Sequence, residues 1–411
     1  MKLTGLITEY NPFHNGHAYH LKKALEVTGA DAAVVIMSGD FVQRGAPALL
    51  PKHMRAKMAL SEGAGAVFEL PVCYACGSAE FFAGGAISLL TQLGCIDSVC
   101  FGSECGSIEP LMKAAKVLSD EPAAFQNILQ EHLKQGLSFP KARQKALISF
   151  LPELKDAGSF LASPNNILAI EYLKAILQQN SPLKPFTISR TGTHYHDTSL
   201  DSPLSSASAI RSAISEGTSL DALETFMPVS ALHILKEAFS CGYPVTLEDF
   251  RLPLKYRLLT ESRDSLCQFA DVSPELADRI CNQLGNFNSL AQFTALLKTK
   301  EMTHARISRA LFHILLGITQ EKLLAYRAEG FTYYARLLGF RTSQKEILTA
   351  VSRSSSIPLL TKITKSSSLS PVGQDMLSLD IRSSDLYEII AADKYRQPFR
   401  SEYQKQIIKL P

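Results

Sequence analysis

The sequence lacks the features that would assign the chain to a membrane, secreted or strongly basic class. No stretch reaches the roughly 18 apolar residues of a membrane span, and Met1-Lys2 leads into a short strand instead of a signal-peptide core. A net charge of +3 over 411 residues is too small to indicate nucleic-acid binding by itself. With 46% hydrophobic and 20% charged residues, the composition is that of an ordinary globular protein of two or three domains, which we expect to be cytosolic.

A second metal-binding cysteine pair is also missing. Cys73 and Cys76 have CxxC spacing, but no second pair and no nearby histidine completes a zinc site. Redox or metal use of this pair is the alternative to buried thiols in a reducing compartment. Most of the eight cysteines are embedded in apolar stretches, which favours buried thiols and predicts no resident metal.

The stretch from Gly5 to His20 is the most informative part of the chain. An apolar strand from Lys2 to Thr8 breaks at Asn11-Pro12, and a helix follows from about Asn15 to Val27. The N-terminus of a helix after a strand attracts anions because its backbone N–H groups are unpaired. His14 and His17 are three residues apart and therefore share one face of the first turn, while Gly16 leaves room for a phosphate. The alternative is that both histidines are solvated polar residues.

Short apolar runs alternate with helical segments through the first 190 residues. We expect strands at 31–37, 66–70, 98–101 and 186–190, and helices at 52–62, 78–93 and 167–178. This alternation predicts a Rossmann-like, doubly wound parallel sheet. The polar loops 38–45 and 102–106 follow two of the strands, at the edge where such sheets bind ligands.

Polar segments further along the chain each allow two interpretations. Asn165 and Asn166 precede a helix, so one can cap it while the other points into a site. His194, His196 and Asp197 could form a metal cluster or a loop that contacts substrate or solvent. Ser205 to Arg211 opens a helix with hydroxyl groups, which suits either phosphate binding or an ordinary helix cap.

The character of the chain changes after about residue 217. Amphipathic helices are expected at 220–240, 246–260, 273–284, 289–297 and 304–315, with no catalytic constellation among them. Residues 331–411 carry twelve Lys or Arg and seven Asp or Glu, a net +5, against −2 for the rest of the chain. This stretch begins with a basic, aromatic strand and continues with basic, Ser-rich patches. We therefore divide the chain into 1–217, 218–330 and 331–411, the last being either a phosphate-backbone contact or a solvated surface.

Several short motifs occur in an order that points to one family. They are Glu9-Tyr10-Asn11-Pro12-Phe13-His14-Asn15-Gly16-His17, Met37 to Gly45, Glu69-Leu70-Pro71, Phe101-Gly102-Ser103-Glu104, Pro164-Asn165-Asn166-Ile167-Leu168, Leu337-Leu338-Gly339-Phe340 and Ile357-Pro358-Leu359. The whole chain resembles the bacterial tRNA(Met) cytidine acetate ligase family, within the His-x-Gly-His nucleotidyltransferase superfamily. Asp40 stands where the family pattern has Asn, and a carboxylate there would repel a triphosphate or recruit Mg²⁺.

The resemblance implies an ATP-dependent ligase. In that family acetate attacks the α-phosphorus of ATP, and the acetyl group then passes to N4 of the wobble cytidine of elongator tRNA(Met). It implies ATP and Mg²⁺ as cofactors, tRNA and acetate as partners, and His14 and His17 as catalytic residues. The alternatives are a small-molecule adenylyltransferase of cofactor biosynthesis and a non-enzymatic RNA-binding protein.

The resemblance also implies a set of binding residues. For ATP these are Ile7, Thr8, Glu9, Tyr10, Asn11, Pro12, Phe13, His14, Asn15, Gly16, His17, Ala18, Tyr19, His20, Ser38, Gly102, Asn165, Asn166 and Arg190. Ser206 and Arg211 match a Ser-Ser-Thr-x-Ile-Arg motif that holds ATP phosphates in the superfamily, although Ala207 departs from it. Charge and composition add Arg353, Lys362 and Lys365 as candidate tRNA contacts, with the basic helix 52–57 as the other location for the tRNA.

Overall fold

A computed structural model describes the whole chain except residues 138, 153–160, 162 and 190–204. Its centre is an eight-stranded sheet in the order β10-β8-β5-β2-β1-β6-β7, with β9 beside β8. The strands are β1 (Leu3–Thr8), β2 (Ala32–Ser38), β5 (Ala66–Leu70), β6 (Ser98–Ser103), β7 (Lys184–Ser189), β8 (Ala335–Arg341), β9 (Leu359–Leu360) and β10 (Ile408–Leu410). Strands β5, β2, β1, β6 and β7 are parallel, whereas β8 runs antiparallel to β5.

The parallel strands confirm the predicted doubly wound sheet. Strand β2 is buried along its whole length, as its continuous apolar sequence predicts for a strand covered on both faces. The chain first winds from β1 to β2 and β5, and then crosses back to β6 on the other side of β1. The strand order therefore reverses between β1 and β6, and ligands bind at such a reversal in open α/β sheets.

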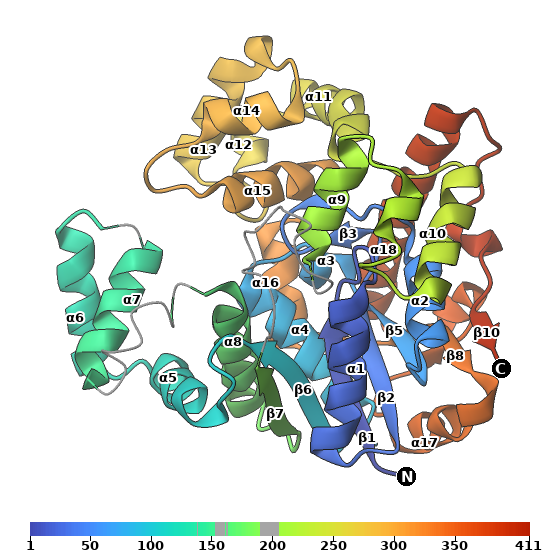
Figure 1. Cartoon of the computed structure of the whole chain (residues 1–411). Coiled ribbons are helices and arrows are strands. Elements are labelled where there is room, and N and C mark those ends of the chain that lie inside the picture. Colours follow the sequence, from blue (N-terminus) through green and yellow to red (C-terminus); the bar gives the residue numbers. More distant parts are fainter. Residues whose placement is uncertain (138, 153–160, 162, 190–204) are drawn as a thin grey trace.

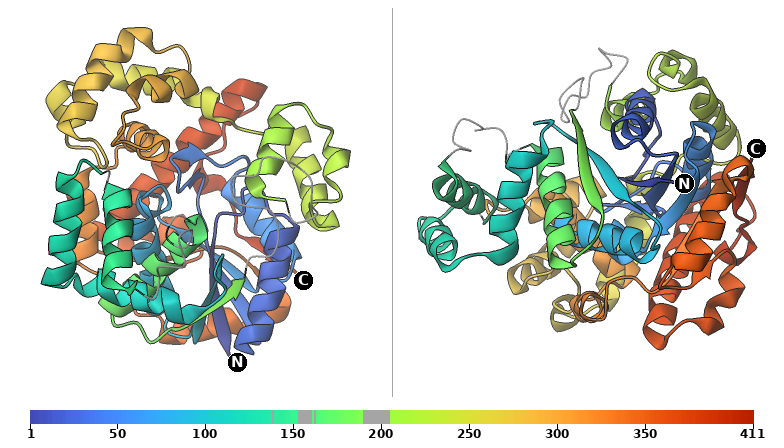
Figure 2. Two further views of the ribbon diagram at one scale, coloured as in Figure 1. Left: turned by 60° about the vertical axis from the view of Figure 1, so that its left-hand side comes forward. Right: turned by 90° about the horizontal axis from the view of Figure 1, so that it is seen from below.

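Helices cover both faces of this sheet (Figure 1 and Figure 2). On one face lie α1 (Asn15–Thr28) and α2 (Lys52–Ser61), and on the other lie α4 (Ala79–Gln92) and α8 (Pro164–Gln178). Leu90 of α4 packs directly over Gly5 of β1, where a Cβ atom would collide with it. The remaining helices of the first half are α3 (Val72–Ala75), α5 (Ile108–Asp120), α6 (Ala123–Lys134) and α7 (Phe139–Phe150); α6 and α7 stand away from the sheet at the left of Figure 1.

The middle of the chain is helical, as the amphipathic patterns predict. Its elements are α9 (Ala207–Ser215), η2 (Leu220–Leu223), α10 (Val229–Ser240), η3 (Leu247–Phe250), α11 (Arg251–Thr260), α12 (Arg263–Leu266), α13 (Pro274–Gln283), η4 (Leu284–Asn286), α14 (Leu290–Leu297), α15 (His304–Leu316) and α16 (Gln320–Ala328). The single helix expected at 220–240 is divided, because Pro228 caps α10 and cannot continue a preceding helix.

The last eighty residues are joined to the first part of the chain through the sheet. They contain α17 (Glu346–Ser354), η5 (Thr342–Gln344), η6 (Ile363–Ser368), α18 (Pro371–Tyr395) and η7 (Glu402–Gln404). The strand expected to begin at Phe331 begins at Ala335 instead, since Phe331 has a φ of +67° and packs against Gly84 of α4. Through β8 and β10, the region 331–411 extends the same sheet that the N-terminal strands form.

Two further features complete the architecture. A short hairpin, β3 (Phe41–Val42) and β4 (Ala46–Pro47), follows β2 and lies against α15, α18 and the segment before α11. In the described part of the chain, every helix is too short or too polar to cross a membrane.

Candidate active site

The turn between β1 and α1 is fastened to the neighbouring loop of the sheet. The Glu9 carboxylate accepts from the Gln43 backbone N–H at 2.9 Å, and Asn11 Oδ1 accepts from the Leu49 N–H at 2.7 Å. Tyr10 and Phe13 are buried with their ring centroids 4.7 Å apart. These contacts fix the chain path from Thr8 to His14, so that α1 begins at the C-terminal edge of the central strand.

His14 and His17 form the first turn of α1 as a reciprocal cap. Nδ1 of His14 accepts from the Gly16 N–H at 3.0 Å, and Nδ1 of His17 accepts from the His14 N–H at 3.3 Å. The two rings are 3.8 Å apart between centroids. Because each Nδ1 is an acceptor, the proton of each neutral imidazole lies on Nε2, which makes Nε2–H the donor group of both rings.

Gly16 is required by this close arrangement. A Cβ atom there would lie 2.8 Å from Cε1 of His14 and 3.0 Å from its Nδ1. Any larger residue would therefore push the His14 ring away from the cap. The three residues of the predicted His-x-Gly-His motif thus form one packed unit at the strand-order reversal.

A second brace lies on the other side of the reversal, after β6. The Glu104 carboxylate accepts from the backbone N–H groups of Asn165 and Asn166 and from the Asn165 amide at 2.7 Å. In return, Asn166 Oδ1 accepts from the N–H groups of Glu104 and Cys105. Glu104 thus caps α8, while the two asparagines hold the loop that follows Gly102.

The remaining candidates for ATP contact fall into three groups. Arg211 donates to the Asn11 carbonyl at 2.5 Å, and Ser206 caps α9 by accepting from the Ala209 N–H, so both lie close to the histidine turn. Ser38 is buried at the end of β2, where its carbonyl accepts from Arg55. Arg190 lies outside the described residues, as do His194, His196 and Asp197.

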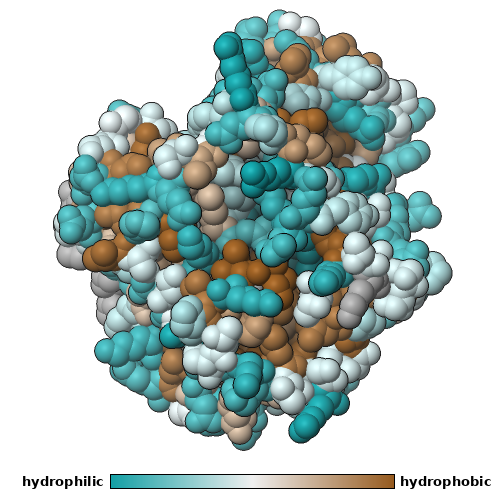
Figure 3. Space-filling view, turned by 90° about the vertical axis from the view of Figure 1, so that its right-hand side faces the viewer, coloured by the Kyte–Doolittle hydropathy of each residue, from teal (hydrophilic) through white to brown (hydrophobic). Residues whose placement is uncertain are grey.

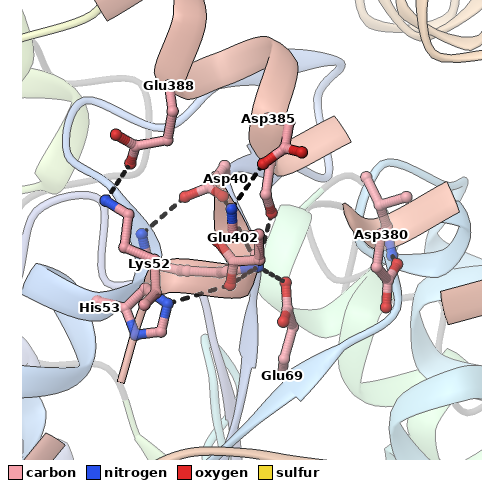
Figure 4. A network of polar contacts seen from close by, with 12 residues as sticks. Asp40, Lys52, His53, Glu69, Asp380, Asp385, Glu388 and Glu402 are labelled. Carbon is pink, nitrogen blue, oxygen red and sulfur yellow. Dashed lines mark hydrogen bonds and ion pairs between the residues drawn. The ribbon is translucent and has the colours of Figure 1, made fainter. Parts of the chain in front are cut away.

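Asp40 points into a buried network of charges (Figure 4). It accepts from the Lys52 backbone N–H at 2.7 Å, and its other oxygen is 3.8 Å from Lys52 Nζ. These contacts account for the carboxylate of Asp40 within the protein itself. Its charge is balanced by a buried lysine and by the N-terminus of α2.

The network around Lys52 was not anticipated from the sequence. Nζ of Lys52 lies 2.7 Å from Glu69, 3.0 Å from Glu402 and 2.6 Å from the Ser384 hydroxyl. Arg336 pairs with the same two carboxylates, Glu69 and Glu402. Burial opposes ionisation, but Lys52 and Arg336 hold the pKa of Glu402 well below its usual range.

The helix α2 is therefore not a basic surface. Lys52 and Arg55 are fully buried, and Arg55 donates to the carbonyls of Leu50, Glu9, Ser38 and Gly39. The side of the molecule that carries α2 and α10 faces the viewer in Figure 3, where apolar side chains gather in a central hollow bordered by polar ones. Lys52, Arg55 and Ala59 share one helical face, but this spacing alone does not tell a buried face from an exposed one.

Of the three candidate tRNA contacts, Arg353 lies apart from the histidine turn. Arg353 is near the end of α17, which packs against Gly65 and Gly94 at the starts of β5 and β6, and so at the opposite edge of the sheet from His14. Lys362 is exposed after β9, and Lys365 lies in η6. Among the described candidates, Arg211 is thus joined to the histidine turn, and Asn165 and Asn166 to the loop after Gly102, whereas Arg353 lies on the far side.

The cysteines and acidic residues show no arrangement for a metal. Cys73 and Cys76 are buried as free thiols, and burial raises the pKa of Cys76 to about 12. Among the residues that the structure describes, no group of three or more His, Cys, Asp or Glu side chains is placed to hold a metal ion.

The chain is similar to known proteins over nearly its whole length. Residues 1–402 match the model of the HIGH nucleotidyl transferase family. The tRNA(Met) cytidine acetate ligase of Clostridium tetani is 40% identical over 414 residues and covers 100% of both chains, and that of Clostridium kluyveri is 41% identical and covers 95% of both.

Solved structures give the same assignment. The apo crystal structure of Thermotoga maritima TmcAL superimposes with a TM-score of 0.94 at 31% identity, covering 100% of both chains. A second crystal form of that protein, bound with alpha-thio ATP, gives 0.92 at 30% identity. By its sequence over the full length and by its fold, the chain belongs to the tRNA(Met) cytidine acetate ligase family.

Proposed function

We propose that the chain is an ATP-dependent ligase that activates acetate as acetyl-adenylate and acetylates N4 of the wobble cytidine of elongator tRNA(Met). The observation that carries this proposal is the closely packed His14–His17 pair at the start of α1, next to the reversal of strand order. The names of the full-length relatives support the choice of acetate and tRNA(Met) as substrates.

In the first step, formation of acetyl-adenylate, negative charge develops on the α-phosphate oxygens, where the two histidines can stabilise it. An acetate oxygen attacks the α-phosphorus of ATP, the bond to the bridging oxygen breaks, and pyrophosphate leaves. The Nε2–H groups of His14 and His17 donate to the phosphate oxygens as charge develops, and the N-terminus of α1 adds its partial positive charge. The cap bonds at Nδ1 hold both rings in the required tautomer before ATP binds.

The second step is the transfer of the acetyl group from acetyl-adenylate to the cytidine, and it forms no new bond to phosphorus. The amine N4 of the cytidine attacks the acetyl carbonyl carbon, AMP leaves as the acyl C–O bond breaks, and N4 loses a proton. Neither acetyl-CoA nor a covalent enzyme intermediate is required. The chain's task in this step is to hold the anticodon over the nucleotide site.

The other ATP contacts belong to this proposal. Segment 7–20, Ser38 and Gly102 surround the phosphates, and Arg190 and Asn165 or Asn166 complete the site. Arg211 and Ser206 contact the phosphates from α9, which the bond from Arg211 to the Asn11 carbonyl supports. Glu104 orients both asparagines and thereby the loop after Gly102.

In this proposal Mg²⁺ is bound by the phosphates of ATP and not by the protein. The described carboxylates form no cluster for it, and Asp40 is occupied by Lys52. Mg²⁺ commonly keeps its waters and binds mainly through substrate phosphates. The metal would neutralise triphosphate charge there, and no step is assigned to a protein-bound ion.

We also propose that Arg353, Lys362 and Lys365 contact the tRNA backbone. Their support is the net charge of +5 in residues 331–411. Neutralising all three to Gln should weaken tRNA binding and flatten its dependence on salt, because Lys and Arg contacts to phosphates release counterions. Unchanged affinity and salt slope in a gel-shift titration would remove these three residues from the interface.

A substrate-dependent assay separates the proposed ligase from its two rivals. Pyrophosphate release is measured with ATP and acetate, with ATP and nicotinamide mononucleotide, and with ATP alone. Release with acetate only, followed by N4-acetylcytidine in tRNA by mass spectrometry, is the expected result. Release with the mononucleotide would indicate a cofactor adenylyltransferase, and no release in any arm would indicate a non-enzymatic RNA-binding protein.

A further inference from the structure

A pocket of about 210 Å³ lies where α11, α15 and α18 meet, outside the proposed nucleotide site. Its lining includes Arg257 of α11, Gly317 at the end of α15, and Arg382 and Ser383 of α18. The pocket therefore lies between the helical middle of the chain and the C-terminal region. No step proposed above uses these residues.

Two of the lining residues hold donors that the described chain leaves unsatisfied. Nε of Arg257 and the Ser383 hydroxyl are both buried and have no hydrogen-bond partner among the described residues. Ser383 is only 3% exposed, so water does not readily replace the missing acceptor. A buried donor without an acceptor destabilises the fold, which makes an acceptor supplied by a ligand favourable.

The charges around the pocket select an anion. Arg257 is held in place by Glu261 at 2.7 Å and by the Phe269 ring at 5.6 Å, while Arg382 is exposed and appears in no ion pair of the described residues. Two guanidinium groups therefore line the pocket; Glu261 pairs with Arg257, and Asp375, the carboxylate that Arg382 influences, is itself paired with Lys322. Guanidinium and hydroxyl donors around a small volume are the groups that bind phosphate oxygens.

The surface next to the pocket favours a nucleic-acid phosphate over a free one. Leu252, Tyr256 and Leu259 lie on one exposed face of α11 and are 73%, 69% and 67% exposed. Tyr256 directly precedes Arg257. An RNA strand carries both phosphates for the arginines and aromatic bases that stack on an exposed tyrosine ring, whereas inorganic phosphate would use only the pocket.

The pocket also lies at the edge of the sheet that carries the histidine turn. Asp380 of α18 accepts from the Val72 N–H just after β5, and Tyr387 donates to the Ala48 carbonyl in the loop after β2. Helix α18 therefore crosses the same edge of the sheet from which α1 begins. We infer that the pocket between α11 and α18 binds a backbone phosphate of the tRNA substrate, an inference that rests on the function proposed above.

The double variant Arg382→Gln/Ser383→Ala tests this inference. Neither side chain makes an ion pair or hydrogen bond among the described contacts, so the fold should tolerate the change, which a thermal melt checks. In filter binding at two salt concentrations, we expect tRNA affinity to fall roughly tenfold and the salt slope to decrease by about 1. Lys134→Gln, which removes one exposed charge from α6, is the matched control and should bind as the parent does.

Separate arms distinguish the sources of phosphate and the two proposals. Parent-like affinity and slope in the double variant would overturn the inference. So would a variant that binds tRNA normally but has lost binding of inorganic phosphate in ³¹P NMR titration, because the pocket would then be a free-phosphate site. Acetate-dependent ATP–pyrophosphate exchange is measured on the parent without tRNA; its absence would overturn the proposed function while leaving the tRNA-binding result intact.

Discussion

The histidine turn and the buried charges around Lys52 both place polar groups at the C-terminal edge of the sheet, but they are built in different ways. His14 and His17 are bonded across three residues, through backbone N–H groups that any helix start provides. Lys52 instead reaches Ser384 and Glu402, more than 300 residues away, and its partners come from β5, α18 and η7. The first cluster is local and partly exposed at His17, whereas the second is distant in sequence and closed to water.

This difference predicts different consequences of mutation. A local motif at a helix start can lose its chemical groups while the fold persists, because the surrounding core is complete without them. A buried ion network cannot lose one member without leaving charges uncompensated in a medium of low polarity. We therefore expect substitutions in the histidine turn to affect catalysis, and substitutions in the Lys52 network to affect the attachment of the C-terminal region.

Lys52→Met should have the largest effect of the changes considered. It removes the buried ammonium group from Asp40, Glu69 and Glu402, although Arg336 still pairs with the last two, and removing one partner of a buried ion pair typically costs about 3–5 kcal/mol. Urea unfolding measures this loss as a lower midpoint. Lys57→Met on the same helix is the control, because Lys57 pairs with Glu237 at the surface, where such a pair is worth about 0–1 kcal/mol. Equal midpoints for the two variants would mean that the buried network contributes no more than a surface pair.

His17→Ala removes a helix-cap acceptor, which typically costs about 0.5–2 kcal/mol, but its main effect should be on catalysis. Loss of one transition-state donor typically lowers the rate by about 10²-fold or more, so acetate-dependent ATP–pyrophosphate exchange should fall by at least that factor. His233→Ala, at an exposed position on α10, is the matched control and should retain parental exchange. Undiminished exchange in His17→Ala would remove the histidine pair from the proposed mechanism.

Glu104→Ala tests hydrogen bonds whose sequence separation is intermediate between those of the two clusters. Glu104 accepts three hydrogen bonds from Asn165 and Asn166, about sixty residues away, so its removal should cost about 1–2 kcal/mol. The loss should be local and visible as faster hydrogen exchange of the first amides of α8. Glu109→Ala, at an exposed ion pair on α5, provides the control. If α8 exchanges at the parental rate, the cap is dispensable.

The contrast also explains how far the sequence could be interpreted. Strands β1, β2, β5 and β6 and the His14–Gly16–His17 turn follow from apolar runs, a helix start and a short motif, all of which are local signals. The partnership of Lys52 with Glu69, Arg336 and Glu402 depends on distant segments meeting in space, and charge counts alone do not predict it. Arg336 contributes to the net charge of residues 331–411 in the same way, although it is buried and paired. Net charge over residues 331–411 therefore overstated the basic surface of that region.

Asp380 offers the smallest and most specific test of the buried network. Its carboxylate accepts from the Val72 N–H at 2.7 Å and from the Tyr334 hydroxyl at 2.5 Å, and burial together with Glu69 raises the pKa of Asp380 to about 7.

An unfolded aspartate titrates near pH 3.9. Between that value and pH 7 the folded state therefore binds more protons than the unfolded state, and stability falls as pH rises through this window. Asn at position 380 does not titrate. The free energy of unfolding of the Asp380→Asn variant should therefore rise relative to that of the parent by on the order of 1 kcal/mol between pH 5 and pH 8. Urea unfolding at a series of pH values measures the difference, with Asp120→Asn at an exposed site of α5 as the control for loss of one charge. A difference that stays constant from pH 5 to pH 8 would mean that Asp380 is already ionised at pH 5, and that Lys52 and Arg336 stabilise its charge as they do that of Glu402.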